Sequence, residues 1–151
     1  MTKTLLDSNQ LNSEIYDEQD KIIYQNFLVK ICINFQQTKY FKDICKTLND
    51  MVKKNKLIRI KFLNNSMRLY FKSDKKNKSF TMIFKNVVFH TYDNYYSKCE
   101  DKIKLDYGGT QVLHYTKILN KAIFNFELHK QCDEMGTLLI INAEKLAIKY
   151  D

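Results

Sequence analysis

The side chains best suited to chemistry are few in this chain, and they stand far apart. The candidates are His90, His114 and His129 together with Cys32, Cys45, Cys99 and Cys132. No two cysteines have the C-x-x-C spacing of a zinc site or a redox motif, and each histidine stands alone in an expected strand. We therefore expect structural histidines and reduced, buried thiols, with no bound metal and no cofactor.

Glycines and acidic residues also give no sign of a standard active site. The three glycines are Gly108, Gly109 and Gly136. Neither a G-x-x-x-x-G-K-[ST] loop nor a G-x-G-x-x-G turn can be built from them, which argues against the common nucleotide-binding enzymes. The acids in YDEQD (16–20) and CEDK (99–102) suit solvated turns, although carboxylates from distant strands can converge. We expect a protein that is not an enzyme.

The chain is strongly basic, with 25 Lys and Arg against 17 Asp and Glu and a formal net charge of +8. Such a surplus favours a polyanionic partner, nucleic acid above all. A second explanation stays open, because a chain rich in Lys, Asn, Ile and Tyr, without Pro or Trp, has the composition expected from AT-rich coding. No apolar run approaches transmembrane length, and neither a signal peptide nor a lipidation motif is expected, which predicts a cytoplasmic protein without a membrane partner.

The hydrophobic periodicity predicts an α+β fold. Residues 1–17 are polar and aperiodic and are interpreted as a flexible arm, followed by a single globular domain over residues 18–151. Apolar stripes at helical spacing over residues 24–35 and 41–52 predict an N-terminal two-helix segment, with Thr38 as a helix cap. The period then changes to two, which predicts six to eight antiparallel strands forming a bent sheet or a small barrel.

The clearest of these elements is a hairpin in residues 57–72, LIRIKFLNNSMRLYFK, which turns at Asn64-Asn65. Asparagine tolerates positive φ, so a two-residue turn is expected at this dipeptide. Three apolar pairs are expected on one face: Phe62 with Met67, Ile60 with Leu69, and Ile58 with Phe71. The opposite face collects basic and aromatic side chains: Arg59, Lys61, Arg68, Tyr70 and Lys72.

Further strands are expected in the second half of the chain. SFTMIFKNVVFHTY (79–92) alternates at first and is then apolar on both parities, which predicts a bent or central strand. A second hairpin is expected around Gly108-Gly109 and a third around NAEK (142–145), because these residues interrupt alternating patterns.

The basic and aromatic face of the first hairpin is the strongest functional signal. Lys61 opposes Arg68, and a like-charged cross-strand pair costs from some tenths to about 1 kcal/mol, a repulsion that a bound polyanion would relieve. Tyrosine and arginine offer platforms on which unstacked bases stack. We expect a nucleic-acid-binding set of Arg59, Lys61, Arg68, Tyr70, Lys72, Lys75, Lys76, Lys78, Tyr95 and Tyr96. The alternative is that these charges only protect an exposed strand from edge-to-edge aggregation.

The hairpin stretch IRIKFLNNSMRLYFKSDKK, the Lys- and Asn-rich composition and the one-domain size resemble the small single-stranded-DNA-binding proteins of AT-rich cytoplasmic elements, such as yeast linear killer plasmids and some large DNA viruses. The resemblance is one of type. It implies a non-enzymatic accessory protein of DNA replication, cytoplasmic and encoded by a plasmid or virus. The expected function is sequence-tolerant binding of single-stranded nucleic acid, DNA favoured, with a homo-oligomer or a protein partner also compatible.

The alternative function is a non-enzymatic protein-interaction module. It would serve as a subunit of a replication or transcription complex, as an inhibitor or as an immunity protein. The amphipathic helices and the strand FKNVVFHTY (84–92) would then form the interface. The first function predicts an affinity for nucleic acid that falls as the salt concentration rises, and the alternative predicts little affinity for nucleic acid.

Overall fold

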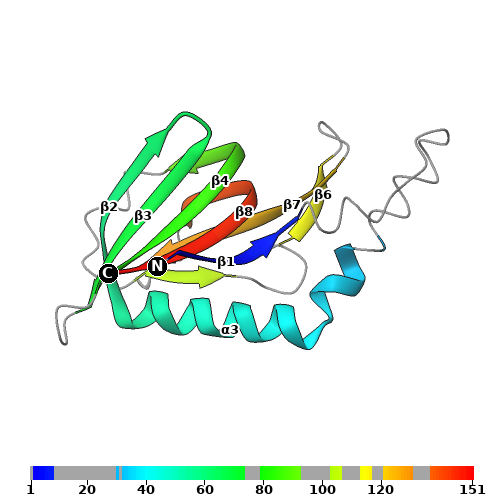
Figure 1. Cartoon of the computed structure of the whole chain (residues 1–151), viewed down its shortest axis with the longest axis horizontal. Coiled ribbons are helices and arrows are strands. Elements are labelled where there is room, and N and C mark those ends of the chain that lie inside the picture. Colours follow the sequence, from blue (N-terminus) through cyan, green and yellow to red (C-terminus); the bar gives the residue numbers. More distant parts are fainter. Residues whose placement is uncertain are drawn as a thin grey trace.

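A strongly bent antiparallel sheet lies over one long helix in the computed structural model of the chain (Figure 1). The structure describes residues 2–8, 30, 32–73, 79–92, 103–106, 113–116, 121–130 and 137–151. The elements are β1 (Thr2–Asp7), α3 (Lys39–Lys54), β2 (Asn55–Leu63), β3 (Ser66–Ser73), β4 (Ser79–Tyr92), β5 (Ile103–Asp106), β6 (Leu113–Thr116), β7 (Lys121–Lys130) and β8 (Thr137–Tyr150). The strand order is β2-β3-β4-β8-β7-β5, with β1 added to β8 and β6 to β7. The described strands form a bent sheet that does not close into a barrel.

Helix α3 forms where the apolar stripe predicts it. The Thr38 hydroxyl accepts a hydrogen bond from the Phe41 amide at 3.2 Å, which caps the helix, and two lysines in the last turn face the negative end of its dipole. The buried stripe comprises Phe41, Cys45, Leu48 and Val52. Of the first predicted helix, residues 32–36 are helical and most of the rest lies outside the described residues. The predicted cap and buried face of α3 are therefore confirmed.

The prediction that two helices open the fold is wrong, because strand β1 precedes them. β1 pairs antiparallel with β8, and Leu6 is only 1% exposed in the core. The amide of Ser8 continues the attachment by donating to the carbonyl of Glu144 at 2.8 Å. Residues 2–7 of the predicted flexible arm thus belong to the sheet, Ser8 is hydrogen-bonded to it, and the remainder of that arm lies outside the described part. A six-residue strand whose partner stands at the other end of the chain has no local signal strong enough to reveal it.

The hairpin of β2 and β3 turns where the sequence predicts. Leu63 pairs with Ser66, so Asn64 and Asn65 form a two-residue turn, and Asn64 takes a positive φ of 55°. The predicted pairs Phe62–Met67 and Ile60–Leu69 are also present.

The third predicted pair of this hairpin is wrong because β2 contains a bulge. The register shifts between Leu57 and Arg59, so Leu57 takes the place opposite Phe71. Ile58 is left as the extra residue and is 56% exposed. A bulge increases the local twist, and at this outer edge of the sheet it also makes further strand pairing less favourable.

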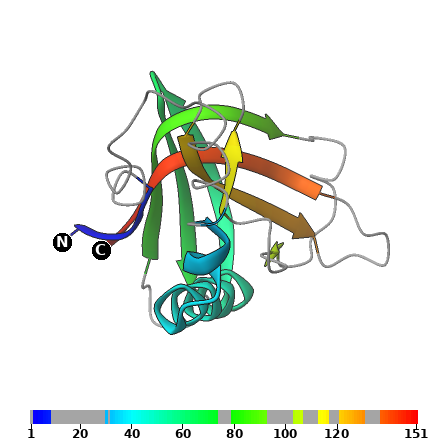
Figure 2. The same ribbon diagram turned by 90° about the vertical axis from the view of Figure 1, so that its right-hand side faces the viewer.

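Strands β4 and β8 are each 14 residues long. Both bend near the place where Asn86 of β4 meets Glu144 of β8. They run side by side and sweep together across the molecule in the end-on view (Figure 2). At the bend of β4, Asn86 has a positive φ of 53°, and its side-chain amide donates to the Glu144 carboxylate of β8 at 2.9 Å. The expectation of a bent strand over residues 79–92 is confirmed.

The third predicted hairpin is wrong, since NAEK lies inside continuous strand β8. Its Asn142 and Ala143 pair with Asn125 and Phe124 of β7. Of the polar residues that resemble a turn in the sequence, Glu144 instead accepts a hydrogen bond from Asn86 at the bend of the sheet.

The second predicted hairpin is also wrong, because β5 and β6 do not pair with each other. Both pair with β7, β5 along Glu127–Lys130 and β6 along Lys121–Phe124. A continuous ten-residue strand offers one long edge that both short strands can occupy in succession. Gly108 and Gly109 lie outside the described residues.

The core fills the space between α3 and the concave face of the sheet. Aromatic rings dominate it: Phe71 stacks on Phe80 at 4.9 Å, and Phe84 meets Phe126 edge-on at 5.1 Å between centroids. Because successive side chains of a strand point to opposite faces, the residues between these core positions point away from the helix. The fold therefore presents the alternate residues of β2 and β3 on an outer face.

We expect Leu6→Ala to lower the free energy of unfolding by about 2–5 kcal/mol, the usual cost of truncating a fully buried leucine. Urea denaturation at neutral pH measures it. Thr4→Ala, at an exposed position of the same strand, is the control and should change stability by less than about 1 kcal/mol. Equal, negligible effects of both substitutions would show that β1 is not part of the folded sheet.

Candidate nucleic-acid interface

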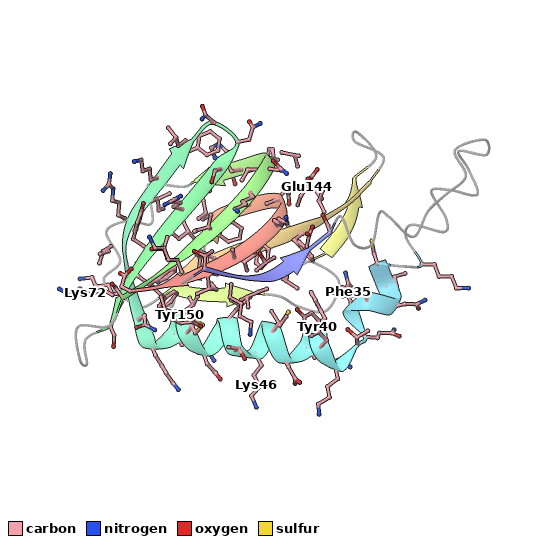
Figure 3. All side chains as sticks on the ribbon, in the orientation of Figure 1. Phe35, Tyr40, Lys46, Lys72, Glu144 and Tyr150 are labelled. Carbon is pink, nitrogen blue, oxygen red and sulfur yellow. The ribbon has the colours of Figure 1, made fainter. Side chains whose placement is uncertain are left out.

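The predicted basic and aromatic residues of the hairpin share the outer face of the sheet. Arg59 of β2 pairs with Tyr70 of β3, and Lys61 pairs with Arg68, as the sequence predicts. Their neighbours along β3 are buried in the core, so alternation directs this set away from α3. Lys72 lies at the end of the sheet near the C-terminus (Figure 3). We call the outward side chains of β2 and β3 the basic face: Lys56, Arg59, Lys61, Arg68, Tyr70 and Lys72.

The other predicted binding residues cannot be placed on this face. Lys75, Lys76, Lys78, Tyr95 and Tyr96 all lie outside the described residues. Their roles stay predictions.

Sequence reasoning missed four further lysines that the fold brings to the same side of the sheet. Lys56 stands opposite Lys72 and lies one residue before the predicted hairpin of residues 57–72. Lys85 of β4 pairs with Lys145 of β8, and Lys149 pairs with Thr81. The alternation of Phe80, Met82 and Phe84 could have revealed Lys85, whereas the expected hairpin at NAEK concealed the outward direction of Lys145 and Lys149.

The middle of the outer face is not open to solvent. Thr81 and Ile83 of β4 and Ala147 of β8 point to the outer side, yet all three are buried. The accessible part is therefore the basic face on β2 and β3, with the exposed side chains of Lys85 and Lys149 at its margins.

Like charges oppose each other at three places on the outer side of the sheet: Lys61 with Arg68, Lys56 with Lys72, and Lys85 with Lys145. Lys145 is compensated by Asp7, with 3.4 Å between its Nζ and the carboxylate. No described acid pairs with Lys61 or Arg68. Each uncompensated pair costs from some tenths to about 1 kcal/mol, so this surface holds a positive potential at the expense of stability.

The Tyr70 ring is covered on one side by Arg59. The guanidinium carbon lies 5.6 Å from the ring centroid, a cation–π arrangement. Tyr70 is half-buried as a consequence of its neighbours. A base that stacks at this position therefore meets the Arg59 guanidinium plane first, or displaces it to reach the ring.

An open depression of about 480 Å³ lies where the basic face meets the hairpin turn and the bend of β4. We call it the turn hollow. It is lined by Lys61, Leu63, Asn64, Asn65, Ser66, Arg68, Tyr70, Lys85 and Asn86. The hollow thus gathers cations from three strands around the hydroxyl and amide groups of the turn.

The cysteine and histidine side chains that the structure describes are not arranged for catalysis. Burial raises the pKa of Cys32 to about 11 and that of Cys45 to about 12, so both thiols are protonated near neutral pH and are poor nucleophiles. The exposed His90 ring packs against Phe62 with 4.5 Å between centroids. The side chains of the other histidines and cysteines lie outside the description.

Two absences concern the described part of the chain alone. No group of three or more His, Cys, Asp or Glu side chains there could hold a metal ion. No helix there is both long and apolar enough to cross a membrane.

A second depression, of about 460 Å³, lies at the edge of the sheet. It is lined by Leu57, Ile58, Arg59, Ile60, Phe62, Met67 and His90. Five of its seven lining residues are apolar, whereas most residues that line the turn hollow are charged or polar.

Comparison with known proteins gives no match: no protein-family model fits the chain, and no curated protein and no solved structure is significantly similar to it. The geometry and charge of the site are therefore what indicates a function.

We expect Lys61→Glu to raise the free energy of unfolding by some tenths to about 1 kcal/mol, because it converts repulsion with Arg68 into attraction. Arg68→Glu alone should act in the same direction, and the double reversal should return to the wild-type value. Denaturation at low salt measures these energies, and the gains should shrink in 0.5 M NaCl, where the Debye length is only several Å. A loss of stability in both single variants would show that the two side chains do not repel each other.

The two described thiols should resist alkylation in the folded protein. At pH 8, a thiol with a pKa of about 11 is ionised to roughly one part in a thousand. Because a raised thiol pKa keeps the neutral form, labelling of Cys32 and Cys45 by iodoacetamide should be slow until the protein is unfolded in guanidinium. Peptide mass spectrometry resolves each site, and fast native labelling would contradict the buried positions.

Proposed function

We propose that this protein binds single-stranded nucleic acid through the basic face, with little preference for sequence. One observation carries the proposal: Arg59, Lys61, Arg68 and Lys72 crowd together on an exposed sheet surface, and Lys61 faces Arg68 without a described acid to offset them. A phosphate backbone supplies the missing negative charge and converts the cross-strand repulsion into attraction.

The chemistry of the face favours a single strand over a duplex. A broad sheet surface does not enter the major groove in the way that a helix does, whereas an unpaired base can stack on the Arg59 guanidinium or the Tyr70 ring. Contacts of charged groups with phosphates and of rings with base faces do not distinguish one base from another, so binding at this surface should depend little on the nucleotide sequence. The resemblance in type noted from the sequence supports DNA as the ligand and a cytoplasmic role as a replication accessory protein.

The salt dependence of such binding has a defined size. If Arg59, Lys61, Arg68 and Lys72 each neutralise one phosphate, log K falls with log[salt] at a slope of about −2.8 for a single strand. Affinity then drops roughly 50-fold between 50 and 200 mM salt.

We expect the double substitution Arg59→Glu and Lys61→Glu to abolish binding of a labelled 30-mer single strand in fluorescence anisotropy, while the protein stays folded by circular dichroism. Charge reversal at two central positions places acids against the phosphates. A duplex 30-mer of the same sequence should bind the wild type more weakly.

A matched control distinguishes the effect of the basic face on binding from the effect of the protein's net charge. Lys42→Glu with Lys46→Glu makes the same charge change on exposed positions of α3, where Lys46 points away from the sheet (Figure 3). The control should retain most of the affinity. Equal losses in both double variants would show that total charge governs binding and would contradict the assignment to the basic face.

A second candidate function is a protein-interaction module, favoured by exposed apolar side chains on the strand that the sequence singled out. Val88 and Phe89 of β4 are both exposed, Phe89 to 50%. Absence of nucleic-acid binding at 50 mM salt would make this the leading function. Sedimentation velocity of the wild type and of Phe89→Ser would then test whether this patch mediates self-association.

A further inference from the structure

The turn hollow differs from the rest of the basic face in its charge and its walls. Three cations line it, Lys61 from β2, Arg68 from β3 and Lys85 from β4, and no acid does. The buried Glu144 is the acid tied to its wall, through Asn86, and does not line the hollow. The residues that line the hollow therefore carry three positive charges and no negative charge.

The walls of the turn hollow are held in place by the backbone. The Val87 amide at the bend of β4 donates to the Asn65 carbonyl of the hairpin turn at 2.8 Å, which joins the two walls. Asn86 is fixed in turn by its hydrogen bond to Glu144. A site whose polar groups are held by such contacts requires less ordering when an anion binds.

The three positive charges of the turn hollow exceed the single negative charge of an internal phosphodiester. A diester carries one negative charge, whereas a terminal phosphomonoester carries about −1.5 to −2 near pH 7 and has three acceptor oxygens. The Ser66 hydroxyl and the Asn64 side chain add neutral donors beside the lysines and the arginine. The chemistry of the hollow thus suits a monoester better than a diester.

The turn hollow is large enough for a ligand bigger than a phosphate group. About 480 Å³ lies within the range of roughly 300–1,000 Å³ that holds small organic ligands, which leaves room for a sugar and a base next to Tyr70. The hollow also lies at the end of the basic face, beside the turn, so a strand that follows β3 from Lys72 arrives here last.

We propose that the turn hollow binds the phosphorylated terminal nucleotide of a single strand, the phosphomonoester contacting Lys61, Arg68 and Lys85. This inference rests on the proposed function of the basic face and names its preferred substrate: strands that carry a terminal phosphate. The same chemistry occurs in a free nucleoside monophosphate, so the experiment includes that ligand separately.

The experiment compares three labelled 20-mers of one sequence by anisotropy: an unphosphorylated strand, a 5′-phosphorylated strand and a 3′-phosphorylated strand. One of the phosphorylated strands should bind about tenfold tighter than the unphosphorylated strand. Thymidine 5′-monophosphate and 3′-monophosphate serve as competitors in separate titrations. Displacement only at concentrations far above those of a phosphorylated strand supports the strand end as the ligand, whereas displacement at equal concentrations makes a free nucleotide the ligand and overturns the proposal.

Two variants with the same charge change locate the effect. Lys85→Gln should reduce the ratio of phosphorylated to unphosphorylated affinity to below about twofold. Lys149→Gln, on the same side of the sheet but outside the hollow, should retain the full ratio. An equal fall of the ratio in both variants would assign the preference to diffuse charge and overturn the proposal.

The outcomes separate this inference from the proposed function. Equal affinity of the wild type for all three strands would overturn the terminal-phosphate inference and leave the binding function intact. If none of the strands bound at 50 mM salt, the proposed function would fail. The terminal-phosphate inference would fail with it, and amide chemical-shift changes of Asn64, Ser66 and Lys85 on addition of the nucleoside monophosphates would then show that the hollow binds a free nucleotide and not a strand end.

Discussion

Strands β4 and β8 bend together, and the hydrogen bond from Asn86 to the buried Glu144 holds the two bends at one level. The rest of the molecule depends on this constraint. The two strands pair with each other along their whole length. On one side of the bend β4 also pairs with β3 and β8 with β1, and on the other side β8 pairs with β7, so a single sheet wraps around the core above α3. Burying a carboxylate is costly unless hydrogen bonds compensate it, which explains why an amide and not an apolar side chain stands opposite Glu144. The same corner ties the hairpin turn to β4 and builds the wall of the turn hollow.

The division between the two faces of β2 and β3 links stability to the proposed function. On the inner side, Leu69 and Phe71 are fully buried and fix the register, because a slip by one residue would expose them. The same register forces Lys61 to face Arg68 on the outer side. The free energy of apolar burial exceeds the repulsion of one such pair, so the fold tolerates a concentrated positive surface that a polyanion would stabilise. Arg59 partly shields Tyr70, and this makes the aromatic platform a composite of guanidinium and ring.

Local patterns predicted the elements whose partners lie nearby in the chain. Thr38, the apolar stripe of α3 and the Asn64-Asn65 turn all act within a few residues, and each was predicted correctly. The failures involve distant partners. β1 depends on β8 at the other end of the chain, and β5 and β6 pair with β7 instead of each other. The bulge at Ile58 also has no sequence signature, because alternation around it reads equally well without an extra residue.

The sequence by itself determined the face on which Arg59, Lys61, Arg68, Tyr70 and Lys72 lie, since a period of two and a two-residue turn leave one register that buries the apolar set. Only the tertiary structure decided what surrounds that face. The path of β8 brings Lys145 and Lys149 to the same side, the bend at Asn86 sets Lys85 beside the turn, and the middle of the sheet is covered. The physical reason is that strand pairing is non-local: which strands become neighbours depends on the shared core and on the bend, and neither is encoded in the period of a single segment.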